Sequence, residues 1–79
     1  MANYSLVMDG KRCIGIWLAN PGYAHDRDLL LALATEKHLP LESFAALSSG
    51  RFRIVPNRFD NKGGVFLMLT EAPAPGERR

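Results

Sequence analysis

Apolar and polar residues alternate most regularly at the start of this chain. Residues 4–8 and 12–18 are rich in β-branched and aromatic side chains, and Asp-Gly-Lys separates them at 9–11. Strands favour such side chains, and Asp-Gly is typical of a tight hairpin turn because glycine tolerates positive φ. The pattern therefore predicts an antiparallel β-hairpin.

A helical pattern follows a second turn signal, Ala-Asn-Pro-Gly at 19–22. A leucine-rich stretch comes after two aspartates, which suit the positive N-terminal end of a helix, and Pro40 ends the pattern. We expect one helix over 26–37 and a short second helix over 41–48, opened by the proline and closed by Gly50. A strand over 41–48 is the less favoured alternative, because the segment contains a glutamate and two alanines.

Two further strands are predicted after the helices. Arginines alternate with bulky apolar residues over 51–55, residues 64–70 are almost entirely apolar, and a polar loop over 56–63 joins them. Residues 72–79 show no apolar periodicity, so we predict a single domain over 1–71 and a flexible C-terminal tail over 72–79. The order ββα(α)ββ indicates an α+β fold, a four-stranded, mostly antiparallel sheet of two hairpins with one main helix across a face.

Both faces of this sheet are predicted to be apolar, whereas an antiparallel sheet commonly has one solvated face. Side chains alternate along a strand, so an uninterrupted register sorts them into two sets. One set is expected to pack under the helix; in the first hairpin its members are Val7, Ile14, Ile16 and Leu18. We predict the other face to be a homodimer or partner interface, because aromatic residues and Met are enriched in such surfaces. Its members are Tyr4, Leu6, Met8, Trp17, Phe66 and Met68. The alternative is that the short second helix and the loops cover this face.

Size and composition favour association with another chain. The chain has 79 residues, a formal net charge of +2 and one cysteine. Small domains usually add a disulfide, a metal or self-association to a limited core. A lone Cys13 excludes an intramolecular disulfide. No apolar run is long enough to cross a bilayer, and no signal-peptide pattern opens the sequence, so we predict a cytoplasmic protein without membrane contact.

No catalytic motif stands out, and we do not expect an enzyme, a cofactor or a metal site. Cys13 falls within a strand, while His25 and His38 fall at opposite ends of one helix, so no cysteine–histidine pair is expected. Asp26 and Asp28 suit a helix start and point to different faces of that helix. The Lys-Gly-Gly sequence at 62–64 precedes a strand, unlike the glycines of a phosphate-binding loop.

The strongest candidate contact surface is the basic strand and loop over 51–62. The five residues predicted to bind a partner are Arg51, Arg53, Arg58, Phe59 and Lys62. We expect the partner to be a larger protein complex, bound stoichiometrically and without catalysis. The alternative is a small nucleic-acid-binding or regulatory module, since single-strand binders combine a basic groove with aromatic platforms.

In size, compact α+β order and absence of catalytic residues and disulfides, the chain resembles the small inhibitors made by phages and mobile elements. The anti-CRISPR proteins are the best-known group. The resemblance implies stoichiometric binding to a bacterial CRISPR–Cas effector complex, which would block target DNA or nuclease recruitment in the cytoplasm of the bacterial host. It covers the chain as a whole and carries over no residue role.

Overall fold

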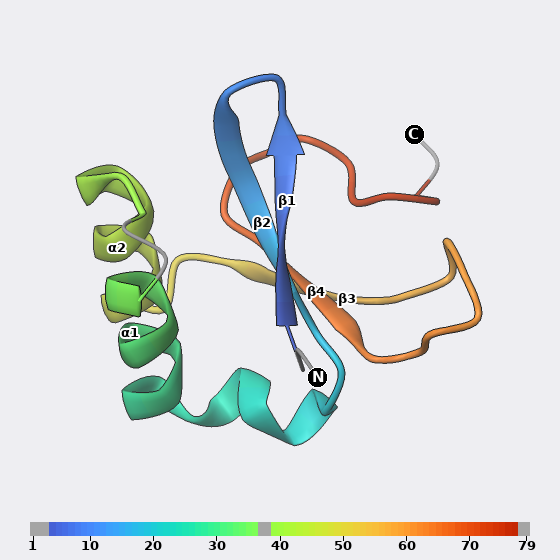
Figure 1. The fold of residues 1–79 in the computed structure, drawn as a ribbon, viewed down its shortest axis with the longest axis horizontal. Coiled ribbons are helices and arrows are strands. Elements are labelled where there is room, and N and C mark those ends of the chain that lie inside the picture. Colours follow the sequence, from blue (N-terminus) through green and yellow to red (C-terminus); the bar gives the residue numbers. More distant parts are fainter. Residues whose placement is uncertain (1–3, 37–38, 78–79) are drawn as a thin grey trace.

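The computed structural model describes residues 4–36 and 39–77. Over these residues the elements in chain order are β1 (Tyr4–Asp9), β2 (Arg12–Leu18), the 3₁₀ helix η1 (Pro21–His25), α1 (Arg27–Glu36), α2 (Leu41–Ser48), β3 (Arg53–Pro56) and β4 (Val65–Met68). The strands form one antiparallel sheet in the order β1-β2-β4-β3. Both helices lie on the same side of this sheet (Figure 1). The predicted α+β fold, with four strands and two helices, is confirmed.

Helix α1 begins where the aspartates predicted it. Asp26 Oδ1 accepts the N–H of Leu29 at 3.1 Å, which satisfies one of the free donors in the first turn. The end predicted for this helix, at residue 37, lies with His38 outside the described residues. The turn predicted over 19–22 leads into η1, which the sequence did not predict. Along the described ranges, no helix combines the length and apolar character needed to span a membrane.

The main core lies between the helices and the sheet. Ile16, Leu18 and Leu67 from the two central strands are at most 1 % exposed. Leu30 of α1 and Leu47 of α2 pack against them. Burial of each such side chain stabilises the fold by about 1.5–3 kcal/mol. As predicted for Ile16 and Leu18, the helices cover this face.

The sorting of β1 and of Ile14 in β2 between the two faces was wrong, because the first hairpin contains a β-bulge. The register shifts by one residue near the middle of β1, so Leu6 lies opposite Ile16. Tyr4 and Leu6 therefore pack on the helix side. Val7 and Ile14, expected on that side, pack on the other face. A shift of one residue moves a side chain to the opposite face because the side-chain period of a strand is two.

The second face of the sheet is covered by the C-terminal residues of the same chain. Phe66 and Met68 are 5 % and 1 % exposed, and Ala74, which packs in the same cluster, is 3 % exposed. Figure 1 shows the last described residues, in red, on the side of the sheet away from the helices. Residues 72–77 belong to the predicted flexible tail, and they thus lie against the sheet. We refer to them as the C-terminal segment.

The close approach of Gly64 to β2 is expected to make this glycine essential. Gly64 has a φ of 77°, and a Cβ atom there would overlap the carbonyl oxygen of Leu18. Gly64→Ala should lower the free energy of unfolding by at least about 2 kcal/mol, since a left-handed backbone alone costs roughly 1–3 kcal/mol in a non-glycine residue. Urea unfolding measures the loss.

Gly63 provides the matched control for this prediction. Its φ is 73°, but a Cβ atom there would meet nothing within 4 Å. Gly63→Ala should therefore cost only the backbone strain, about 1 kcal/mol. Equal losses in the two variants would show that the contact with Leu18 contributes nothing.

Candidate functional site

The structure divides the five predicted contact residues between the two ends of β3. Arg51 lies between α2 and β3, and Arg53 is the first residue of the strand. The other three belong to the loop over 57–63 that joins β3 to β4. Strand β3 therefore separates a loop surface from a surface near the end of α2.

Side-chain hydrogen bonds hold the loop in a defined conformation. The Asn57 amide donates to Asp60 Oδ1 and to the Gly63 carbonyl oxygen, both at 2.8 Å. The Asn57 Oδ1 atom accepts from the Phe59 N–H at 2.9 Å. Trp17 of β2 donates from Nε1 to the same Gly63 carbonyl oxygen at 2.8 Å. The loop is thus tied both to itself and to the sheet.

The Asp60 carboxylate is part of this framework. Its Oδ1 atom accepts the Lys62 N–H at 3.0 Å as well as the Asn57 amide. These two hydrogen bonds hold the pKa of Asp60 below its ordinary value, the one from Lys62 contributing most. Asp60 is therefore ionised at neutral pH and offsets part of the positive charge of Arg58 and Lys62.

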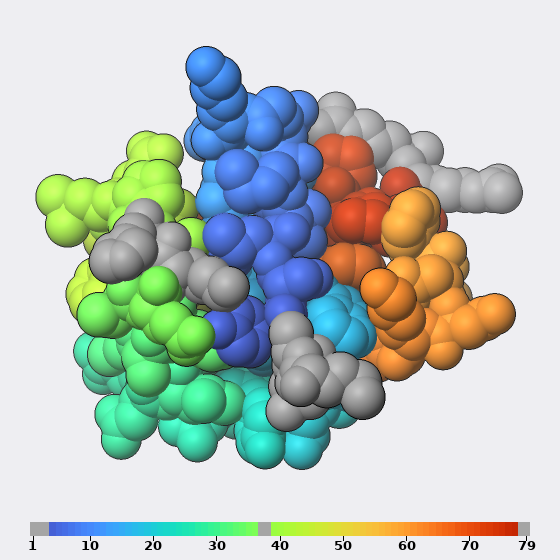
Figure 2. Space-filling view, viewed as in Figure 1, coloured from blue at the N-terminus to red at the C-terminus, as the bar shows by residue number. Residues whose placement is uncertain are grey.

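Phe59 is the most exposed aromatic residue among those described, at 64 %. Its backbone lies against the C-terminal segment, since a Cβ atom on Gly76 would come within 3.0 Å of the Phe59 Cα atom. Figure 2 shows the loop, in orange, projecting at one side of the molecule. The loop thus presents a large apolar side chain to solvent.

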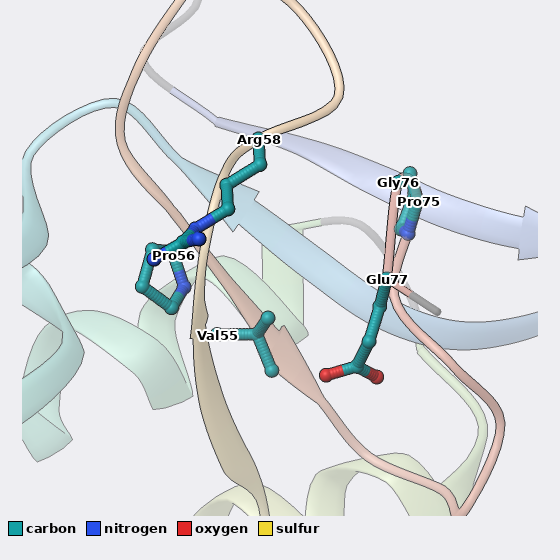
Figure 3. A pocket seen from close by; sticks show the side chains of 6 residues that line it. All are labelled: Val55, Pro56, Arg58, Pro75, Gly76 and Glu77. Atoms are coloured by element: carbon teal, nitrogen blue, oxygen red, sulfur yellow. The ribbon is translucent and has the colours of Figure 1, made fainter. Parts of the chain in front are cut away.

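A hollow of about 470 Å³ lies between this loop region and the C-terminal segment. In Figure 3, Pro56 and Arg58 lie on one side of it and Glu77 on the other, with Val55 between them. Pro75 and Gly76 complete the lining. The hollow is open, so it suits a side chain of another molecule better than an enclosed small ligand.

Arg53 is engaged within the chain. Its Nη1 atom donates to the two Glu77 carboxylate oxygens at 3.0 and 3.1 Å, and its Nη2 atom donates to the Ala72 carbonyl at 2.7 Å. Glu77 also accepts the Ala74 N–H at 3.0 Å. The Ala74 N–H and, after it, Arg53 hold the pKa of Glu77 below its ordinary value. Arg53 therefore fastens the C-terminal segment to the sheet, and Glu77 balances its charge.

The six side chains predicted to form a second interface are Tyr4, Leu6, Met8, Trp17, Phe66 and Met68. The bulge places the first two on the helix side. The last two are buried in the cluster that includes Ala74 of the C-terminal segment. Trp17 is half-buried on that second face, and Met8 is 49 % exposed near the hairpin turn. The structure does not bring the six together on one exposed surface.

A second concave surface lies at the α2 end of β3. Two adjoining hollows of about 220 and 490 Å³ share four lining residues. These are Arg12, Arg51, Leu69 and Thr70. We refer to the two hollows together as the arginine groove. Arg12 was absent from the predicted contact residues. It reaches this surface because the strand order brings the start of β2 beside the end of β4, and this order leaves no local signal in the sequence.

The residues considered for catalysis lie apart or serve the fold. Cys13 is buried, its Sγ atom donates to the Gly15 carbonyl at 3.3 Å, and burial raises the pKa of the thiol. His25 is the last residue of η1, and Asp26 accepts the Leu29 N–H at the start of α1. Over residues 4–36 and 39–77, no group of three or more His, Cys, Asp or Glu side chains is placed to hold a metal ion.

Comparison with known proteins adds no family or function. No family model, curated protein sequence or solved structure matches this chain. A functional assignment therefore rests on the loop over 57–63 and on the arginine groove.

The contact between Arg53 and Glu77 is expected to control how firmly residues 72–77 cover the sheet. Folding lowers the pKa of Glu77. The contact therefore stabilises the segment fully at pH values above the unfolded pKa of about 4.3. This stabilisation is lost as the pH falls through the lowered pKa of the folded state. Glu77→Gln should therefore reduce hydrogen-exchange protection of the residue 77 amide several-fold at neutral pH. Acidification of the unaltered protein below about pH 4 should have the same effect.

Glu71→Gln is the matched control. Glu71 is an exposed glutamate that directly precedes the segment, and Glu71 itself makes no ion pair within the described residues. NMR-detected exchange, corrected for intrinsic rates at each pH, measures the effect. Equal protection in Glu77→Gln and the unaltered protein would show that the ion pair does not hold the segment.

Proposed function

We propose that this protein is a non-catalytic binding module that occupies a surface of a larger protein through its loop over 57–63. The observation that carries the proposal is the 64 % exposed Phe59 on a loop held by Asn57 and Trp17. Aromatic side chains, Phe among them, are enriched in protein interfaces. A loop that is already ordered loses little conformational entropy on binding, which favours affinity.

The charges around Phe59 also fit a protein surface. Arg58 and Lys62 flank the ring in the sequence, and Asp60 lies between them. Mixed charges at the rim of an interface speed encounter and select the correct partner. The Phe59 ring would enter an apolar pocket of the partner, while the hollow beside it receives a protruding side chain.

A nucleic-acid partner fits the same surface less well. Single-strand binders combine several aromatic platforms with a continuous basic groove. Here the cations lie at two ends of β3, and Glu77 neutralises Arg53 between them. Phe59 is also the one aromatic side chain on the loop. A protein partner is therefore the function that this geometry supports best.

The resemblance to small phage inhibitors supplies the class of partner to test first. We propose a bacterial CRISPR–Cas effector complex, bound stoichiometrically in the host cytoplasm so that target DNA or a recruited nuclease is excluded. The proposal for this partner class rests on the likeness in size and element order and on the lack of an enzymatic motif.

Loss of the Phe59 ring is expected to abolish most of the binding. Phe59→Ala should weaken affinity for the partner by at least about 2 kcal/mol, roughly 30-fold, because aromatic anchors of interfaces contribute this much. The partner would be captured from a bacterial lysate on the tagged protein, purified and titrated by calorimetry. In a bacterium whose CRISPR–Cas system targets a phage, the unaltered protein should restore plaques and Phe59→Ala should not.

Leu41→Ala provides the control, because Leu41 is an apolar residue that is 82 % exposed on α2, away from the loop. Its binding and plaque counts should equal those of the unaltered protein. No plaque restoration in any CRISPR–Cas type would remove the effector complex as the partner. Failure to retain any protein stoichiometrically would overturn the binding-module function itself.

Binding to random DNA and RNA oligonucleotides should stay negligible even at low salt. Phosphate contacts release counterions, so a nucleic-acid binder would bind most tightly under these conditions. Fluorescence anisotropy over a salt series measures this. Tight, salt-dependent binding that Arg51→Ala and Arg53→Ala abolish would favour the nucleic-acid module instead.

A further inference from the structure

The arginine groove brings together two guanidinium groups from distant parts of the chain. Arg12 follows the first hairpin turn, and Arg51 follows α2. Both line each of the two adjoining hollows. Antiparallel pairing of β2 with β4 places Thr70 beside the same hollows. Two cations and a hydroxyl group therefore face one concave surface.

Arg51 is held at the Nε atom of its guanidinium group and at its backbone. Its Nε atom donates to Ser49 Oγ at 2.8 Å, and that hydroxyl donates to the Ala45 carbonyl at 2.7 Å. The Arg51 backbone N–H donates to the Ala46 carbonyl at 2.9 Å, which ties the residue to the end of α2. The Nε position is thus occupied, and the terminal pair Nη1 and Nη2 is left to bind a ligand end-on.

Neither arginine of the groove forms an ion pair within the described part of the chain. The ion pair found there joins Arg53 to Glu77, and none joins Arg12 or Arg51 to a carboxylate. The Thr70 hydroxyl oxygen accepts the Ala72 N–H at 3.2 Å, so its own hydrogen remains to be donated. The groove therefore offers donors that a carboxylate or a phosphate would accept.

Two glutamates that line the groove favour a carboxylate over a phosphate as its ligand. Glu42 lines one hollow and Glu71 lines the other. Their negative charges oppose a dianion or a chain of phosphates, whereas a single carboxylate needs only the two Nη donors of one arginine and a second cation nearby. We infer that the arginine groove binds a carboxylate side chain of an acidic segment in the protein partner. This inference rests on the proposed function, because the carboxylate is expected to come from the same partner that Phe59 contacts.

Titration with a capped peptide that carries one glutamate tests the groove without the partner. Amide resonances of residues 69–71 should shift saturably in NMR spectra of the full chain. Arg12→Gln and Arg51→Gln should each weaken the affinity at least about tenfold, as expected for the loss of a charge-assisted hydrogen bond. Lys11→Gln is the matched control, because it removes one positive charge beside Arg12 from a residue that lines neither hollow.

Four results would overturn the inference. These are the absence of saturable shifts, shifts confined to the loop over 57–63, equal weakening by Lys11→Gln, and tighter binding of inorganic phosphate than of the peptide. Arg51→Lys separates recognition by the planar fork from simple charge, since it keeps the cation and should still weaken binding. Because Phe59→Ala leaves the groove intact, loss of partner binding in that variant and loss of peptide binding in the arginine variants are independent outcomes.

Discussion

A sheet with two apolar faces is the constraint on which the rest of this structure depends. All four residues of β4 are buried, because the strand lies between β2 and β3 and is covered from both sides. The two helices cover one face only. The chain covers the other face with residues 72–77, and Arg53 fastens them through Glu77 and the Ala72 carbonyl. A second small cluster around Phe66 thereby adds to the core that the helices form.

The candidate binding surfaces follow from this second covering. The C-terminal segment forms one wall of the hollow beside the loop, and its Gly76 supports the backbone of Phe59. Trp17, on the same face, fixes the loop through the Gly63 carbonyl. Because Arg53 is engaged in holding the segment, the other predicted contact cations, Arg51, Arg58 and Lys62, lie at the two ends of β3. The division into a loop surface and an arginine groove is thus a consequence of how the sheet is covered.

The four strands and the two α-helices could be predicted because each has a local signal, such as Asp-Gly in the first turn or the aspartate before α1. The faces of β1 could not, because the bulge lies in a stretch where every residue is apolar or glycine, so a one-residue slip leaves no trace in the pattern. The covering of the second sheet face by residues 72–77 could not be predicted either, since these residues show no apolar periodicity. Arg12 and Arg51 line the same hollows because of the strand order, which cannot be recognised from any short stretch of the sequence.

The length of β3 limits which partner can use both surfaces at once. Its four residues span about 13 Å, in a molecule of 28 × 24 × 21 Å. A standard interface covers about 800 Å² per partner, which is enough to include both ends of β3 on a total surface of 5290 Å². Such a partner has to cross the outer edge of β3, where Pro56 has no N–H to donate and Ile54 is 42 % exposed. Because Pro56 cannot donate a hydrogen bond along this edge, the proposed contact favours side chains over a strand added along the full length of β3. Under the proposed function, a partner that uses both surfaces would present an apolar pocket and a carboxylate on one face, about 13 Å apart or more.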